Sequence, residues 1–190
     1  MARVLLSDMH MQSSDEIEVE QAIAGDRAAF ARLIARHYDL IFRVAFRLLG
    51  TQADAEDLAQ DVCIELPAKL KSFKGQSKFS TWLYQVVMNK ARDGLRKRAT
   101  HAKAASGWGE REVLLKAEHA ETNEAIDWLY TAMSGLSDDL RETVALVLGE
   151  ELNHAEVGEV LGVSEGTVSW RMSEVRKALK EQAKAEDMLK

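Results

Sequence analysis

The sequence has few of the residues that cross-link, kink or anchor a polypeptide. Cys63 is the only cysteine among 190 residues, so no disulfide can form within the chain and no cysteine cluster can hold a metal. Pro67 is the only proline and glycine is sparse, whereas an all-β protein of this size needs many turn-forming residues. No apolar run approaches the roughly 20 residues of a membrane span. Residues 1–12 are too polar for a signal peptide, and we expect a cytoplasmic protein.

Catalytic and metal-binding patterns are also missing. The five histidines lie scattered without the paired spacing of metal ligands, at His10, His37, His101, His119 and His154. The many Asp and Glu residues fall on faces that should be solvated. We therefore expect no metal, no cofactor and no enzymatic activity.

What the sequence does contain is helix-forming residues with helical periodicity. Apolar residues make up 46% of the chain, and between residues 30 and 49 they recur every three or four positions. We predict an all-α fold of two small helical domains joined by a flexible linker. The predicted boundaries are a possibly disordered extension (1–14), a first domain (15–99), the linker (100–122) and a second domain (123–185).

Some local details can be predicted inside the first domain. Pro67 lies within a helical pattern, so we expect a kink or an early helix end near Ile64. Residues 71–80 read as a loop, after which Ser80 or Thr81 caps a helix that ends near residue 99. On that helix, the side opposite the apolar face carries Gln85, Met88, Asn89, Arg92, Arg96 and Lys97.

Charge is segregated along the chain. The formal net charge is −6, which by itself disfavours a free-standing DNA-binding protein. Residues 51–66 and 137–159 are acidic, whereas residues 84–103 are basic. Separate acidic and basic faces suggest two kinds of partner.

The second domain carries the spacing of a helix-turn-helix. Gly158 supplies a small residue where two helices meet, and Gly162 tolerates positive φ in the turn. Val168 is an apolar residue that joins the two helices, and Ser164 can cap the second one. Such a second helix lies in the DNA major groove. An ordinary αα-hairpin remains the structural alternative.

Three stretches resemble a known family. Leu136-Ser-Asp-Asp-Leu-Arg-Glu-Thr-Val, followed by residues 154–171, resembles region four of extracytoplasmic-function sigma factors of bacterial RNA polymerase. Asp54-Ala-Glu-Asp-Leu-Ala-Gln-Asp-Val resembles the polymerase-binding part of region two. Phe73-Lys-Gly-Gln-Ser-Lys-Phe-Ser-Thr-Trp-Leu-Tyr, continuing to Arg98, resembles its promoter-melting part. The chain departs from the family pattern at Ser137, Trp170 and Glu174, so the promoter sequence is not predicted.

The resemblance implies a transcription initiation factor with three kinds of contact. Contacts with core RNA polymerase fall on Asp54, Glu56, Asp57, Leu58, Gln60 and Asp61. Contacts with minus-ten promoter DNA fall on Phe73, Lys74, Lys78, Phe79, Trp82, Asn89, Arg92 and Arg96. Contacts with minus-thirty-five DNA fall on Ser164, Glu165, Thr167, Ser169, Trp170, Arg171, Ser173, Arg176 and Lys177. It also implies an anti-sigma factor as partner and a role in a stress or signal response.

Each of these assignments has a structural alternative. The acids of 54–61 would equally suit a solvated helix N-terminus, because the helix dipole favours negative charge there. Phe73, Phe79 and Trp82 have a spacing that suits core packing. A stand-alone helix-turn-helix regulator, which binds duplex DNA without polymerase, is the alternative function.

Overall fold

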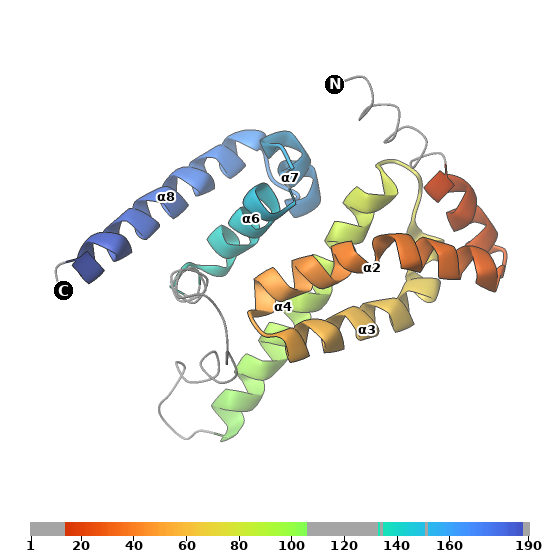
Figure 1. The fold of residues 1–190 in the computed structure, drawn as a ribbon, viewed down its shortest axis with the longest axis horizontal. Coiled ribbons are helices and arrows are strands. Elements are labelled where there is room, and N and C mark those ends of the chain that lie inside the picture. Colours follow the sequence, from red (N-terminus) through yellow and green to blue (C-terminus); the bar gives the residue numbers. More distant parts are fainter. Residues whose placement is uncertain (1–13, 106–132, 134, 151, 188–190) are drawn as a thin grey trace.

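The structure is a computed structural model that describes residues 14–105, 133, 135–150 and 152–187. Every regular element within these ranges is helical, which confirms the predicted all-α fold. The elements form an N-terminal module (residues 14–105) and a C-terminal module (residues 133–187), and the two pack against each other (Figure 1).

The N-terminal module consists of a helical segment over 14–23, then α2 (Arg27–Leu49), α3 (Gln52–Lys69), the short 3-10 helix η1 (Leu70–Ser72) and α4 (Phe79–Ala105). The side chain of Asp26 accepts hydrogen bonds from the backbone of the first turn of α2 and so begins this helix. Gly50, at φ 80°, ends it in the left-handed conformation that glycine adopts readily. Thr51 then caps α3 through the Asp54 N–H.

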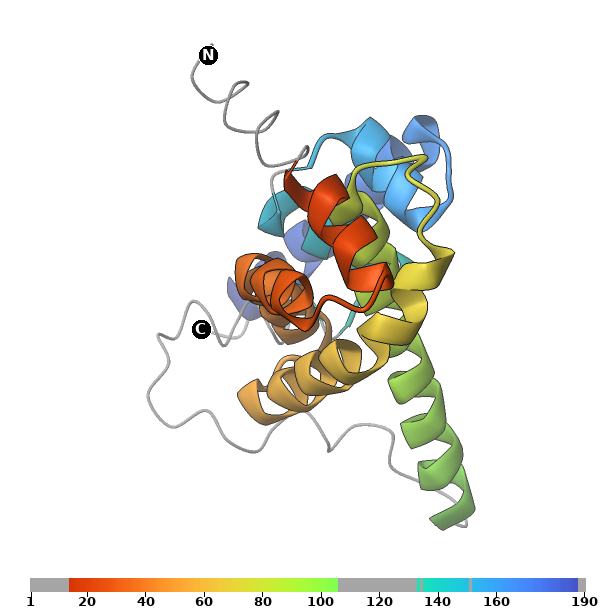
Figure 2. The ribbon, with the colours of Figure 1, turned by 90° about the vertical axis from the view of Figure 1, so that its right-hand side faces the viewer.

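The core of this module lies where α2, α3 and α4 meet. Each of these helices contacts the other two, and α4 crosses the pair formed by α2 and α3 (Figures 1 and 2). The fully buried side chains include Leu33, Ile41, Leu66, Leu83 and Val87. Burial of such large apolar side chains is the main source of stability for each helix.

The helical segment 14–23 is joined to α2 by ion pairs. Asp15 contacts Arg36 at 2.5 Å and the Nε2 atom of His37 at 2.9 Å, and Glu18 contacts Arg32 at 2.9 Å. Asp15 and Glu18 are mostly buried, so the cations also compensate the carboxylates for lost hydration.

The structure corrects two helix ends. Of the two alternatives expected at Pro67, a kink or an early helix end near Ile64, the early end is wrong, because α3 continues to Lys69. Pro67 lies in the last turn, where losing one backbone donor interrupts little of the helix. The prediction that Ser80 or Thr81 caps α4 is also wrong, since α4 already begins at Phe79.

The other end of α4 also differs from the prediction. The helix continues to Ala105 instead of ending near residue 99, and its C-terminal part projects beyond the bundle (Figure 2). Residues 96–105 are rich in Ala, Arg and Lys, which favour helix, and contain no glycine or proline.

The C-terminal module consists of α6 (Asp138–Gly149), α7 (His154–Leu161) and α8 (Glu165–Asp187). Asn153 and Glu156 form a reciprocal capping box that begins α7. Gly162 ends α7 at φ 69°, and the Ser164 hydroxyl accepts from the Thr167 N–H at 3.1 Å to cap α8. Gly158 lies against the backbone of the turn, where an added Cβ would be 2.7 Å from the carbonyl oxygen of Val163. These features confirm the predicted helix-turn-helix.

Candidate functional site

The first candidate surface is the acidic face of α3. Asp57, Gln60 and Asp61 are exposed, whereas Asp54 and Glu56 are half-buried. Leu58 is buried and contributes to the core instead. A partner that binds this face therefore contacts carboxylates and one amide. Leu58 does not contact the partner directly but packs in the core under this face.

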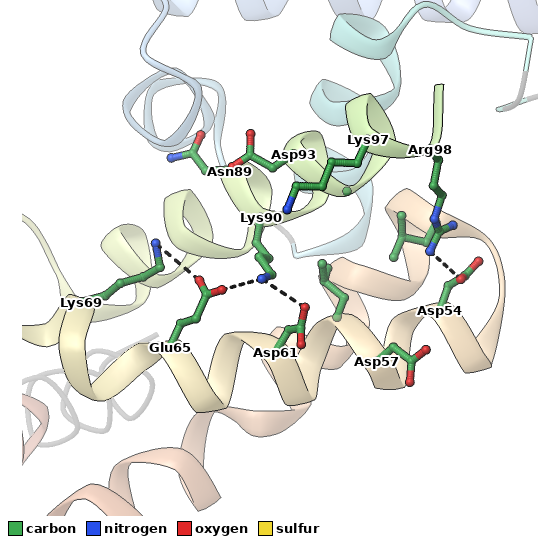
Figure 3. A pocket seen from close by; sticks show the side chains of 13 residues that line it. Asp54, Asp57, Asp61, Glu65, Lys69, Asn89, Lys90, Asp93, Lys97 and Arg98 are labelled. Carbon is green, nitrogen blue, oxygen red and sulfur yellow. Dashed lines mark hydrogen bonds and ion pairs between the residues drawn. The ribbon is translucent and has the colours of Figure 1, made fainter. Parts of the chain in front are cut away.

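Basic side chains of α4 face these carboxylates across a groove (Figure 3). Lys90 contacts Asp61 at 3.1 Å and Glu65 at 2.5 Å, and Arg98 contacts Asp54 at 2.6 Å. The hydrogen bond from Lys90 lowers the pKa of Glu65, and Glu65 in turn raises the pKa of Lys90.

Asp54 and Asp57 differ in how far their charge is compensated. Burial opposes the charged form of Asp54, but hydrogen bonds from Arg98 and Thr51, together with the positive charge of Arg98, outweigh it and lower the pKa of the carboxyl. Asp57 forms no hydrogen bond or ion pair with any residue that the structure describes. Its negative charge is thus the most available to a basic partner.

The second candidate surface joins the segment 73–78 to one face of α4. Phe73, Phe79 and Trp82 form an aromatic cluster, with ring centroids 5.4–5.7 Å apart. Phe79 is only 3% exposed and also packs edge-on against His37. Phe73 and Trp82 are half-buried. The cluster is part of the core, as its spacing suggested, and Phe79 cannot reach a base without rearrangement.

The polar residues predicted near this cluster are more accessible, with one exception. Lys74, Lys78, Asn89 and Arg96 are exposed. The exception is Arg92, whose guanidinium donates two hydrogen bonds of 2.6 Å to Glu142 of α6. Glu142 is therefore hydrogen-bonded to the guanidinium of Arg92, which the sequence assigned to DNA contact.

For the same face of α4, the prediction that Met88 points outward is wrong. Met88, expected on the outward side, is 1% exposed. Gln85, from the same side, donates to the backbone carbonyl of Glu159 in α7 at 3.0 Å. This part of α4 is covered by the C-terminal module, which periodicity within one helix cannot reveal.

The third candidate surface is α8, the second helix of the helix-turn-helix. Val168, Met172 and Val175 are buried and fix the helix to α6 and α7. The opposite side is open: Ser164, Glu165, Ser169, Trp170, Ser173, Arg176 and Lys177 are exposed, and Thr167 is half-buried. Trp170 is 60% exposed, which is unusual for so large an apolar side chain.

Two predicted DNA contacts on α8 already have partners inside the chain. The Arg171 side chain is 12% exposed and contacts Asp139 at 2.7 Å, with Thr143 at 3.5 Å. Ser169 shares a 2.8 Å hydrogen bond with Nδ1 of His154. Arg171 thus holds α8 against α6, a role that the sequence pattern did not reveal.

Comparison with known proteins identifies the family. Residues 33–101 match the description "Sigma-70 region 2", and residues 132–181 match "Sigma-70, region 4". The chain is 30% identical over 175 residues to the ECF RNA polymerase sigma factor SigW of Bacillus subtilis, covering 86% of this chain and 94% of SigW. The chain belongs to the extracytoplasmic-function sigma factors. Members of this family are transcription initiation factors and not enzymes, as predicted.

Other sigma factors are similar over almost the whole chain. SigM of Mycobacterium tuberculosis is 30% identical over 170 residues, covering 90% of this chain and 84% of SigM. The sigma-E factor of Escherichia coli is 26% identical over 182 residues, covering 90% of this chain and 95% of sigma-E.

Two solved complexes share the fold of this sigma factor. CnrH, in complex with the cytosolic domain of CnrY, matches with a TM-score of 0.66 and 25% identity, over 90% of this chain and 98% of CnrH. The sigma factor RpoE of Bartonella quintana, in complex with the anti-sigma factor NepR, matches with the same TM-score and identity, over 82% of this chain and 96% of RpoE.

Within the described residues of this sigma factor, no helix is long and apolar enough to cross a membrane. The same residues contain no group of three or more His, Cys, Asp or Glu side chains that could hold a metal ion.

Proposed function

We propose that this sigma factor docks on core RNA polymerase through the acidic face of α3. The observation that supports the proposal is the family match of both regions in one chain, together with the exposed carboxylates of Asp57 and Asp61 at the matching position. Asp54, Glu56 and Gln60 extend the same face, and Leu58 supports it from the core. Asp57 is its most available charge.

The basic face of α4 and the segment before it would contact the minus-ten DNA. Lys74, Lys78, Asn89 and Arg96 offer exposed cations and an amide to the phosphates and the open strand. Arg92 joins them once it leaves Glu142. Phe73 and Trp82 can present ring edges to an unstacked base, while the buried Phe79 supports them.

The exposed side of α8 would read the minus-thirty-five DNA in the major groove. Its N-terminal end supplies Ser164, Glu165 and Thr167, and Ser169 and Trp170 follow on the open side. Ser173, Arg176 and Lys177 extend the surface toward the backbone phosphates. Arg171 is proposed as a support for the helix orientation, because its guanidinium already contacts Asp139.

We further propose that an anti-sigma factor controls this protein, and that this protein acts in a signal or stress response. The support is the structural likeness to RpoE in its complex with NepR. We also propose that residues 15–99 form the first domain, residues 100–122 the linker and residues 123–185 the second domain.

The test is promoter-specific transcription with purified core polymerase. Asp57→Lys should abolish core binding and discrete transcripts, because it reverses the uncompensated charge of the docking face. Glu20→Lys is the matched control: it makes the same change of charge at an exposed acid of the segment 14–23, and it should retain both activities.

The outcomes separate this function from the alternative. Discrete transcripts from wild type and Glu20→Lys, but not from Asp57→Lys, support the docking face. If the free protein binds one duplex sequence tightly and polymerase adds nothing, the chain is instead a stand-alone regulator. Equal transcription by Asp57→Lys and wild type would contradict docking on polymerase through the acidic face of α3.

A further inference from the structure

A buried network of ion pairs fixes the helical segment 14–23 to α2 in this sigma factor. The segment lies near the connection between η1 and α4 (Figures 1 and 2). Asp15 contacts Arg36 at 2.5 Å and Nε2 of His37 at 2.9 Å, and Glu18 contacts Arg36 at 2.9 Å. Apolar side chains could join the two helices without the loss of hydration that buried charges suffer. Stability alone therefore does not account for this network.

The imidazole of His37 connects this network to the aromatic cluster at the start of α4. His37 is 4% exposed, and its ring lies edge-on against Phe79, with centroids 5.1 Å apart and ring planes at 65°. Because a carboxylate accepts hydrogen bonds, Nε2 of His37 donates to Asp15, and this bond sets the orientation of the imidazole. The strength of an edge-to-face contact depends on ring orientation. Asp15 thus fixes the ring against which Phe79 packs.

Phe79 lies at the centre of the aromatic cluster. Its ring also contacts Phe73, with centroids 5.7 Å apart and planes at 89°, and Trp82, with centroids 5.6 Å apart. Phe73 follows η1 and Phe79 begins α4, so the contact between these two rings joins both ends of the segment 74–78. The position of Phe79 therefore determines how this segment, with its exposed lysines, is held.

We propose that Asp15 and His37 are positioning residues for promoter opening, which hold the aromatic cluster in the arrangement that binds an unstacked base of minus-ten DNA. The inference rests on the proposed function, which assigns the half-buried rings of the cluster to that base. Asp15 and His37 are buried and act through Phe79 instead of touching DNA. Unstacking a base costs free energy that contacts to the base must offset. A displaced cluster therefore slows strand opening more than it weakens the binding of polymerase.

The first experiment measures the position of the cluster without DNA, by hydrogen–deuterium exchange of the full chain and mass spectrometry of its peptides. Asp15→Asn keeps the size of the side chain but removes its charge, and so weakens the hydrogen bond that orients His37. We expect exchange over residues 73–80 to become at least about threefold faster than in wild type.

Glu18→Gln is the matched control. It removes a second buried carboxylate from the same segment, but the ion pairs of Glu18 are with Arg32 and Arg36. Both variants should speed exchange over residues 14–23, whereas Glu18→Gln should leave exchange over residues 73–80 within about twofold of wild type. If the two variants speed exchange over residues 73–80 equally, a general loosening of the segment explains the effect and the proposal fails.

His37→Gln tests the other end of the same contact. Glutamine retains an N–H group that can donate to Asp15, but it lacks the ring against which Phe79 packs. We expect faster exchange over residues 73–80 with little change over residues 14–23. Unchanged exchange over residues 73–80 would show that His37 does not hold the cluster.

The second experiment measures strand opening by the holoenzyme on a promoter that wild type transcribes. Permanganate detects unpaired thymines in the minus-ten element, and a separate titration gives the affinity for core polymerase. Asp15→Asn and His37→Gln should open the promoter about three- to tenfold more slowly than wild type, with core affinity within about twofold. Glu18→Gln should open it at the wild-type rate.

A template whose minus-ten element is unpaired in advance separates positioning from loss of folded protein. On this template no unpairing is needed, so transcription by Asp15→Asn should return to within about twofold of wild type. An equal deficit of Asp15→Asn on the paired and unpaired templates would overturn the positioning role, because a smaller amount of folded protein lowers both.

Failure of this inference is distinguishable from failure of the proposed function. If wild type holoenzyme opens no promoter, the proposed function has failed, while hydrogen exchange still decides whether Asp15 and His37 hold the cluster. If Asp15→Asn and His37→Gln open the promoter as fast as wild type, the positioning role is refuted and the proposed function stands.

Discussion

Gly158 gives the sharpest stability prediction for the helix-turn-helix. Its Cβ, if present, would lie 2.7 Å from the Val163 carbonyl oxygen, and this backbone atom cannot turn away as a side chain can. Ala is favoured over Gly inside a helix by about 0.8–1 kcal/mol, whereas overpacking costs about 1–3 kcal/mol. We expect Gly158→Ala to change the free energy of unfolding by between zero and about 2 kcal/mol, in the destabilising direction.

Gly94 provides the matched comparison. It lies within α4, and an added Cβ would meet nothing within 4 Å. Gly94→Ala should therefore gain the helix-propensity term alone and stabilise the protein by about 0.5–1 kcal/mol. The helix-propensity term is common to both variants. Their difference, about 1–3 kcal/mol, isolates the steric cost at the turn.

The assay is urea denaturation followed by circular dichroism and by tryptophan fluorescence. The two transitions must coincide for a single free energy to be meaningful in a protein with two modules. In thermal unfolding, a difference of 1 kcal/mol corresponds to about 2–4 °C in Tm for a chain of this size. If Gly158→Ala stabilises as much as Gly94→Ala, the close approach between α7 and the turn is refuted.

Three further predictions use the same structure. Asn153→Ala removes the capping box of α7 and should cost about 1 kcal/mol of unfolding free energy in urea denaturation. Trp82→Ala, in the aromatic cluster, should cost about 2 kcal/mol or more, whereas Trp170→Ala should change stability by less than about 0.5 kcal/mol yet reduce polymerase-dependent protection of minus-thirty-five DNA. Burial opposes ionisation of Glu150, the residue that ends α6, but hydrogen bonds from Arg43 and Arg47 of α2 and from the Tyr84 hydroxyl of α4 outweigh it and lower its pKa below the ordinary 4.5. Its contribution to the free energy of unfolding should be complete above about pH 4.5 and be lost as the pH falls further, and in urea denaturation at a series of pH values Glu150→Gln should lack this loss.

The helix-turn-helix could be predicted from the sequence because its requirements are local. Gly158, Gly162 and Ser164 each answer a constraint set by residues within six positions: a close backbone approach, a positive φ and a free N–H. Local constraints of this kind produce a sequence pattern that can be recognised without knowledge of the rest of the fold. The caps at Gly50 and Thr51, between α2 and α3, also depend only on residues a few positions away in the chain.

The partners of α4 could not be predicted in this way. Met88 and Arg92 read as outward because helical periodicity identifies one apolar face and assigns the rest to solvent. Arg92 pairs with Glu142 of α6 and Gln85 donates to Glu159 of α7, and both of these helices begin more than forty residues later in the chain. A polar residue such as Glu142, which pairs in the interface, has no signature that separates it from a solvated acid.

The candidate site residues also divide into those whose exposure follows from the local sequence and those whose contacts depend on the tertiary fold. Exposure of Asp57 and Trp170 agrees with their predicted roles, since a polar helix N-terminus and an open recognition face are both consequences of local amphipathicity. The sequence pattern groups Arg171 with Trp170, because both lie on the expected outward side of the second helix. The structure gives it a partner in Asp139, 32 positions earlier, so only tertiary contact distinguishes a supporting arginine from a DNA-contacting one.

The ion pair between Arg92 and Glu142 also changes the meaning of the charge pattern. Segregated acidic and basic stretches suggested two external partners, but Glu142 of the acidic stretch pairs with Arg92 of the basic one inside the chain. An acidic C-terminal module therefore competes with DNA phosphate for the same guanidinium. Salt weakens the contacts of a DNA-binding surface with phosphates strongly, whereas the Glu142 side chain is only 11% exposed and its ion pair with Arg92 is screened less. Raising the ionic strength should therefore favour the pairing of Arg92 with Glu142 over a contact between Arg92 and a DNA phosphate.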